Sequence, residues 1–130
     1  MKIMVCYDGS NASRSALNLA IKYAQAFKAK VYLVASIEKG TEGEQAVIQQ
    51  LETELKNGED KLAKAGIDCE TQLLVRGMTP DEDLISYARE QGIDEIAIGI
   101  QRRSKVSKFF FGSTAQYLIL NAHCPVITIK

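Results

Sequence analysis

Residues 3–10 read Ile-Met-Val-Cys-Tyr-Asp-Gly-Ser, an apolar run that ends at once in a turn sequence. A short run of this kind is typical of a strand buried on both faces, as in the centre of a parallel sheet. From Ser13 the apolar residues recur at helical spacing, and Ser10 is well placed to cap that helix. The chain therefore opens with a strand and then a helix. The helical residues predicted to form the apolar stripe are Ala16, Leu17, Ala20, Ala24 and Phe27.

The rest of the chain repeats this alternation of strand and helix. Strands are predicted over residues 3–7, 31–37, 67–75, 95–100 and 125–129. Helices are predicted over residues 13–27, 44–65, 80–92 and 113–122. Such alternation indicates a parallel sheet covered by helices on both faces. We expect a single α/β domain over residues 1–130, with three α/β/α layers and a Rossmann-like, mostly parallel open sheet of strand order 3-2-1-4-5.

Several helix boundaries carry sequence signals of their own. The stretch Thr79-Pro80-Asp81-Glu82 combines a capping-box spacing with proline at the first helical position, which makes it the clearest helix start. Val47 opens an apolar stripe in the long second helix, and Gly66 is a natural stop for that helix.

Composition excludes several classes of partner. Lys and Arg number 16 and Asp and Glu number 16 among 130 residues, so no net charge attracts DNA, RNA or an anionic membrane. No apolar run approaches the roughly 20 residues that span a bilayer, and the first residues lack the layout of a cleavable signal. The three cysteines form no paired pattern, which suits a reducing compartment. We expect a cytoplasmic protein that binds neither nucleic acid nor membrane.

The candidate site lies at the carboxyl ends of the predicted strands, where open parallel sheets bind their ligands. The first strand delivers Tyr7 and Asp8 to this edge, the second delivers Ser36, and the fourth delivers Ile98. Asp8 has two readings before any family is considered. Its carboxylate either accepts hydrogen bonds from a ribose or an adenine amino group, or it caps the first helix and braces the turn.

A second segment, residues 99–113, has the composition of a phosphate-binding loop. Gly99 ends a strand, four basic residues follow between positions 102 and 108, and Gly112-Ser113 opens a helix. Free N–H groups at a helix start and the helix dipole both favour an anion there. The alternative is a solvated basic loop with Ser113 as an ordinary helix cap.

This segment resembles the nucleotide motif of the universal stress protein family: glycine, two residues, glycine, nine residues, glycine, then serine or threonine. Gly99, Gly112 and Ser113 match that motif. The opening strand that runs into residues 8–10 and the ending at residues 122–126, Ala-His-Cys-Pro-Val, are also similar to the family. The resemblance covers the whole chain.

The resemblance implies an adenine nucleotide as the ligand: ATP, ADP or AMP, with any Mg²⁺ arriving on the phosphates. It implies that Asp8 and Ser36 contact adenine or ribose, and that Thr114 joins the residues that line the phosphates. The full set of candidate binding residues is Tyr7, Asp8, Ser36, Ile98, Gly99, Arg102, Gly112, Ser113 and Thr114.

One position departs from the family motif, because Arg102 stands where the second glycine belongs. If the backbone there needs a positive φ, arginine costs on the order of 1 kcal/mol and its side chain crowds the phosphates. If the backbone is relaxed, the guanidinium itself grips a phosphate in bidentate fashion.

No enzyme signature is present. The sequence has no Walker-type phosphate loop, no framed serine nucleophile and no zinc motif, and its one histidine, His123, is far from Asp8 in sequence. We expect no catalytic residue, no metal ligand and at most slow ATP hydrolysis. The predicted role is a stress-response module that binds a nucleotide. The alternative is a homodimeric scaffold of the same fold without nucleotide. Under both, residues 125–130 form a strand that either pairs with its copy in a dimer or stays a protected edge.

Overall fold

The structure, a computed structural model, describes residues 1–38, 44–100 and 112–130. Its strands are β1 (Lys2–Cys6), β2 (Lys30–Ser36), β3 (Cys69–Leu74), β4 (Glu95–Gly99) and β5 (Val126–Ile129). Its helices are α1 (Asn11–Phe27), α2 (Glu44–Lys64), α3 (Pro80–Glu90) and α4 (Ser113–Asn121). The predicted order of strands and helices is confirmed, and the boundaries differ by a few residues at most.

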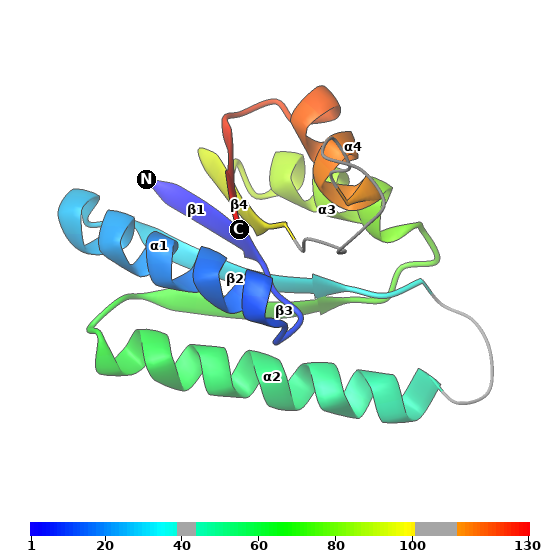
Figure 1. Ribbon diagram of the computed structural model, residues 1–130, viewed down its shortest axis with the longest axis horizontal. Helices are drawn as coiled ribbons and strands as arrows, with labels where there is room; N and C mark the ends of the chain where they lie inside the picture. Colours follow the sequence, from blue (N-terminus) through cyan, green and yellow to red (C-terminus); the bar gives the residue numbers. More distant parts are fainter. Residues whose placement is uncertain (39–43, 101–111) are drawn as a thin grey trace.

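The five strands form one sheet in the order β3-β2-β1-β4-β5 (Figure 1). All four neighbouring pairs are parallel, which confirms the predicted fold class. The first strand lies at the centre, and the chain crosses over it once, from β3 at one edge to β4 on the other side of β1. This reversal leaves a crevice at the carboxyl ends of the strands on either side of it.

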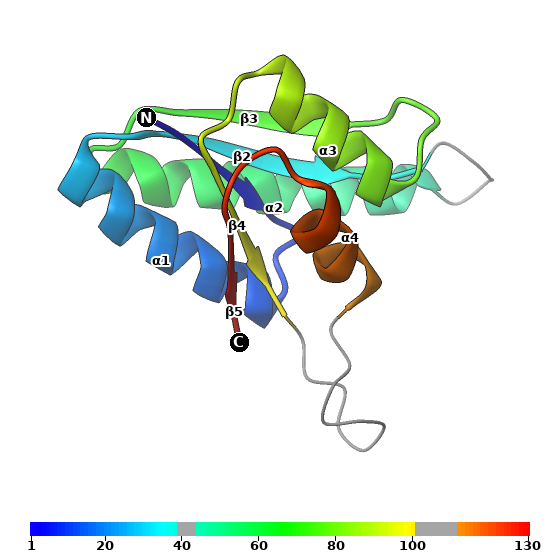
Figure 2. The same cartoon turned by 90° about the horizontal axis from the view of Figure 1, so that it is seen from above.

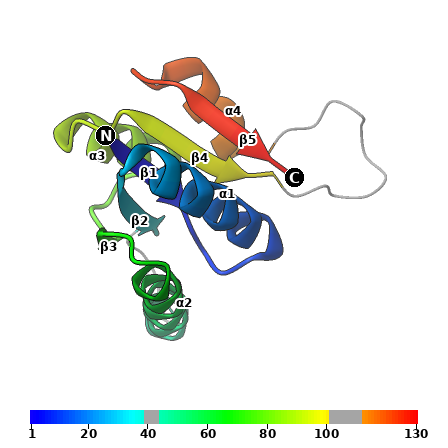
Figure 3. The same ribbon diagram turned by 90° about the vertical axis from the view of Figure 1, so that its left-hand side faces the viewer.

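Helices cover both faces of the sheet (Figures 1 and 3). One face packs against α1 and α2, and the other packs against α3 and α4. The alternation of side chains along β1 shows the two cores directly: Ile3 and Val5 belong to the first, and Met4 and Cys6 to the second. Gly58 lets α2 approach the sheet, since a Cβ there would lie 2.5 Å from the side chain of Leu33.

The two predicted helix caps are present. The Ser10 hydroxyl oxygen accepts a hydrogen bond from the backbone N–H of Ser13 at 3.2 Å, and α1 begins at Asn11. The Thr79 hydroxyl oxygen accepts one from the N–H of Glu82 at 3.4 Å, with Pro80 as the first helical residue. Each cap satisfies a backbone donor that the helix itself leaves free.

Two residues assigned to the apolar stripes are exposed instead. The Phe27 side chain is 62% exposed and meets the Tyr23 ring edge-on, with ring centroids 6.2 Å apart. Val47 is 45% exposed. Both lie in an end turn of their helix, where fewer neighbours surround the stripe, so helical spacing alone predicted too much burial. In the described part of the chain, no helix combines the length and apolarity that a membrane crossing requires.

Candidate functional site

A pocket of about 440 Å³ lies at the carboxyl ends of β1, β2 and β4. Its volume falls within the range of small-molecule sites, roughly 300–1,000 Å³. Seen from above in Figure 2, the start of α4 lies near the end of β4. The structure therefore brings together segments that are up to about a hundred residues apart in sequence. The candidate residues that line the pocket are Tyr7, Asp8, Ser36, Ile98, Gly99, Gly112, Ser113 and Thr114.

The ninth candidate, Arg102, lies outside the described residues. Part of the lining comes from helices, which the pattern of strand ends and glycines in the sequence does not indicate. Leu51 on α2 and Pro80 and Leu84 on α3 also line the pocket. A signal for α3 was available: a helix that follows a parallel strand begins at the same edge of the sheet as the strand's carboxyl end.

Asp8 braces the turn between β1 and α1. Its Oδ1 accepts a hydrogen bond from the backbone N–H of Ser10 at 2.9 Å, and its own N–H donates to the Ser13 hydroxyl at 3.4 Å. Gly9 supplies the left-handed backbone that the turn needs, with φ of 83°. Ser10 therefore caps the helix, and Asp8 braces the turn. The Asp8 side chain remains exposed at the pocket, so it is also available to a ligand.

The pKa values of two groups at the pocket, Asp8 and Cys6, are shifted away from pH 7. Desolvation acts to raise the pKa of Asp8, but hydrogen bonds from Ser10 and Ser13 outweigh it and lower that pKa. Burial, assisted by the nearby Asp8 charge, raises the pKa of the Cys6 thiol from 9.0 to about 12. Neither group is poised to exchange a proton near pH 7. Cys6 is thus a buried apolar residue rather than a reactive thiol, as its place in a strand predicts.

Gly99 is required by packing between β4 and α1. A Cβ at this position would overlap the carbonyl group of Ala12 in the first turn of α1. The first glycine of the motif therefore permits the strand end and the helix start to touch, apart from anything a ligand demands.

Gly112 has no such explanation in the described part of the protein. A Cβ there would meet no described atom within 4 Å, and its φ of −52° is open to any residue. Gly112 occupies the N-cap position of α4, and no side chain caps the helix. The alternative of Ser113 as the cap is therefore wrong: Ser113 is the first helical residue. Within the described residues, no side chain caps the N–H groups of this first turn, so they are available to a ligand.

The two helix starts at the pocket differ in charge. The first turn of α4 contains no acidic residue and has no side-chain cap. The first turn of α3 is capped by Thr79 and contains Asp81, Glu82 and Asp83. Since a helix start favours anions only where its N–H groups are free and no acid competes, the α4 side suits a phosphate and the α3 side does not.

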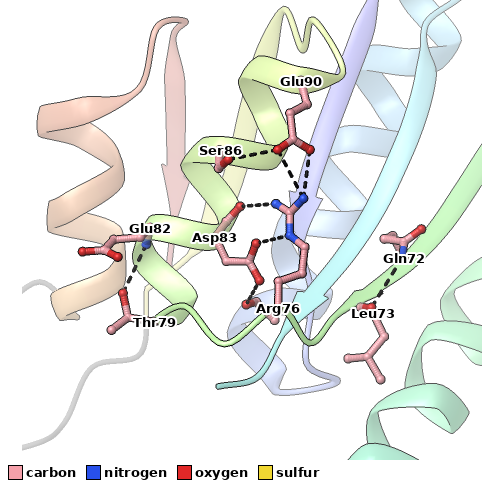
Figure 4. Close-up of polar contacts among 9 residues, drawn as sticks. Gln72, Leu73, Arg76, Thr79, Glu82, Asp83, Ser86 and Glu90 are labelled. Atoms are coloured by element: carbon pink, nitrogen blue, oxygen red, sulfur yellow. Dashed lines mark hydrogen bonds and ion pairs between the residues drawn. The ribbon is translucent and has the colours of Figure 1, made fainter. Parts of the chain in front are cut away.

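An ion pair in which only the carboxylate is fully buried lies beside Ser36, which lines the pocket. Asp83 is fully buried, and its Oδ1 accepts a hydrogen bond from Arg76 Nε at 2.6 Å. Arg76 also binds both carboxylate oxygens of Glu90, at 2.9 and 3.2 Å, and Ser86 donates to Glu90 at 3.0 Å (Figure 4). The Ser36 hydroxyl lies 3.4 Å from Asp83 Oδ2. The end of β2 is thereby tied to α3 and to the turn after β3.

The described residues contain no group of three or more His, Cys, Asp or Glu side chains that could hold a metal ion.

Comparison with known proteins agrees with this architecture. A model of the universal stress protein family matches residues 1–130. A universal stress protein of Methanocaldococcus jannaschii is 30% identical over 142 residues, which cover 99% of this chain and 81% of the relative. A universal stress protein structure from Archaeoglobus fulgidus is 34% identical with a TM-score of 0.88, covering 100% of this chain and 93% of that one. A second Archaeoglobus fulgidus structure, in complex with dAMP, is 29% identical with a TM-score of 0.82, covering 99% and 96%.

Proposed function

The chain belongs to the universal stress protein family, and on this premise we propose that it binds an adenine nucleotide in the pocket at the carboxyl ends of β1, β2 and β4. The observation that carries the proposal is the uncapped start of α4 facing the same pocket as Asp8. One end of the pocket favours a phosphate and the other presents a carboxylate acceptor. The dAMP complex of the Archaeoglobus fulgidus relative supports the same ligand class.

The charges around the pocket favour one orientation of the nucleotide. The phosphates lie over Gly112, Ser113 and Thr114, where free N–H groups and the helix dipole stabilise negative charge. The adenosine lies toward Asp8 and Ser36, whose oxygen atoms accept hydrogen bonds from ribose hydroxyls or the adenine amino group. The opposite orientation would set phosphates beside Asp8 and the acidic first turn of α3.

ATP, ADP and AMP share this adenosine end and differ in how far their phosphates extend along α4. In the proposed complex Mg²⁺ enters bound to the phosphates, and Arg102 supplies a phosphate contact from the loop after β4. The chain acts as a cytoplasmic stress-response sensor, and the signal is whether its pocket holds a nucleotide. Hydrolysis of bound ATP is at most slow. A partner reads the occupancy by binding the loaded and empty forms with unequal affinity.

Isothermal titration calorimetry tests the nucleotide proposal. The purified protein is titrated with ATP, ADP and AMP, each with and without Mg²⁺. We expect saturable binding, and an Asp8→Ala variant should bind at least about tenfold more weakly because it loses a charged acceptor. Asp60→Ala is the matched control, since Asp60 is an exposed acid on α2 that pairs with Lys56 at 3.5 Å and does not line the pocket. An absence of heat at millimolar nucleotide would overturn the proposal.

A second candidate function is a homodimeric interaction module that works without nucleotide. The observation that favours it is the apolar surface near the sheet edge: β5 lies at the edge, and Ile119 and Leu120 on the preceding helix α4 are 47% and 73% exposed. Under either function, we propose that residues 125–130 pair with their copy at this edge of the sheet. The second candidate would be favoured if protein freed of nucleotide forms a dimer and titration with nucleotide gives no binding heat.

A further inference from the structure

We propose that Asp83 sets the direction of the Ser36 hydroxyl and thereby selects a 6-amino purine over a 6-oxo purine. This inference rests on the proposed nucleotide function. It concerns Asp83, which does not line the pocket. Asp83 is thus a positioning residue that acts through Ser36.

The Asp83 carboxylate is held in one orientation. It is fully buried, Arg76 Nε donates to its Oδ1 at 2.6 Å, and Arg76 Nη2 donates to its backbone oxygen at 3.3 Å. Glu90 holds the other side of the guanidinium. Arginine only donates hydrogen bonds, so both Asp83 oxygens that Arg76 contacts act as acceptors.

This fixes the role of the Ser36 hydroxyl. Its Oγ lies 3.4 Å from Asp83 Oδ2, and of these two atoms only the hydroxyl carries a hydrogen. Ser36 therefore donates its one proton toward Asp83. Because Ser36 lines the pocket, what its oxygen offers a ligand is lone pairs. From the pocket side, the Ser36 side chain is an acceptor.

An acceptor at this position distinguishes purines by their substituent at carbon 6. Adenine has an amino group there, which donates a hydrogen bond to Ser36. Hypoxanthine and guanine have a carbonyl oxygen there, which would face another acceptor and leave both unpaired in a partly desolvated site. We expect AMP to bind about tenfold or more tightly than IMP, since the two differ only in the 6-amino against the 6-oxo group and the proton on N1.

Calorimetric titration with AMP and IMP provides the test, in wild-type protein and two variants. Ser36→Ala removes the acceptor, so AMP affinity should fall, and IMP affinity should stay the same or rise because its 6-oxo group no longer faces an acceptor. In Asp83→Asn, Arg76 Nε still requires an oxygen partner, which turns the amide nitrogen toward Ser36. The amide then donates a hydrogen bond to the Ser36 oxygen, and the Ser36 hydroxyl hydrogen points into the pocket as a donor. The preference for AMP should therefore shrink or reverse.

Ser86→Ala is the matched control. Ser86 donates to Glu90 in the same ion-pair network but does not line the pocket, so its AMP-to-IMP ratio should equal that of the wild type. Thermal unfolding reports whether Asp83→Asn folds. A folded Asp83→Asn variant that keeps the wild-type AMP-to-IMP ratio overturns the positioning role of Asp83, and Ser36→Ala separately tests the acceptor at Ser36.

The outcomes separate the two proposals. If wild-type protein binds none of ATP, ADP, AMP and IMP, the nucleotide function fails and the selection proposal fails with it. If it binds AMP and IMP equally well, or if Ser36→Ala weakens both by the same factor, the selection proposal is overturned while the nucleotide function stands.

Discussion

The α-carbon of Gly99, at the end of β4, packs against the carbonyl group of Ala12, in the first turn of α1, so closely that a Cβ atom on Gly99 would overlap it. The contact joins two parts of the pocket wall through their backbones. Backbone atoms cannot rotate away as the end of a flexible side chain can, so this position tolerates no side chain without movement of the helix or the strand.

We therefore expect Gly99→Ala to lower the free energy of unfolding by roughly 1–3 kcal/mol through overpacking. Urea denaturation followed by circular dichroism measures this change. The conformational entropy of glycine acts in the opposite direction and would make the variant more stable if no clash existed. Equal or higher stability of the variant would therefore show that the contact is absent.

Gly112→Ala should have the contrasting effect. A Cβ there meets no described atom, so the free energy of unfolding should change by less than about 1 kcal/mol, the scale of a weakened N-cap. The methyl group would stand where the proposed phosphates approach the start of α4, and AMP affinity should fall about tenfold. Calorimetry of the folded variant measures this. Unchanged affinity would place the phosphates elsewhere.

Cys6 should make stability depend on pH in the alkaline range. Burial raises the pKa of its thiol to about 12 in the folded protein, whereas the unfolded chain loses that proton near 9.0. Between these pH values the folded state holds one more proton than the unfolded chain. The free energy of unfolding therefore keeps its full value below pH 9 and falls as the pH rises above 9. The expected fall is about 1.4 kcal/mol per pH unit.

Denaturation of wild-type protein and Cys6→Ala at several pH values between 8 and 10.5 isolates this effect. Other groups that titrate in this range are common to both proteins, so they cancel in the difference. The wild-type curve should fall more steeply by the stated slope. Two parallel curves would show that the thiol is not buried as described.

The proposed dimer can be tested at Thr128. In β5 the carbonyl oxygens of Pro125 and Ile129 accept hydrogen bonds from β4, so the backbone of the even-numbered residue Thr128 points to the open edge. Thr128→Pro removes one outward N–H without a loss to β4. Light scattering should then report a weaker dimer or a monomer. Thr128→Ala, which keeps the N–H, is the control; equal masses for both variants would contradict pairing through this edge.

The local elements were predictable because their signals lie within a few neighbouring residues. Strand runs, helical spacing and the caps at Ser10 and Thr79 each depend on contacts between residues close in sequence. The position of the candidate site followed from a general property of parallel sheets, and eight of the nine candidate residues lie around one pocket. Their role in binding stays a prediction.

Other features required contacts between distant segments, about which local spacing carries no information. The exposure of Phe27 and Val47 depends on what lies beside the end turn of each helix. The pocket walls on α2 and α3, at Leu51 and Leu84, depend on where those helices pack against the sheet. A periodic pattern shows which face of a helix is apolar but not what that face meets.

By itself, the sequence determined an alternating α/β chain with a parallel sheet and placed its polar candidates at one edge, because strand and helix formation and the connection rules act locally. Only the tertiary structure decided that Gly99 meets Ala12 and that Ser36 donates to a buried Asp83 held by Arg76. Those contacts join β4 to α1, and β2 to α3 and the turn after β3. Hydrophobic burial brings these elements together, but it is non-directional. The pairing of particular atoms is therefore decided only when the packed elements meet.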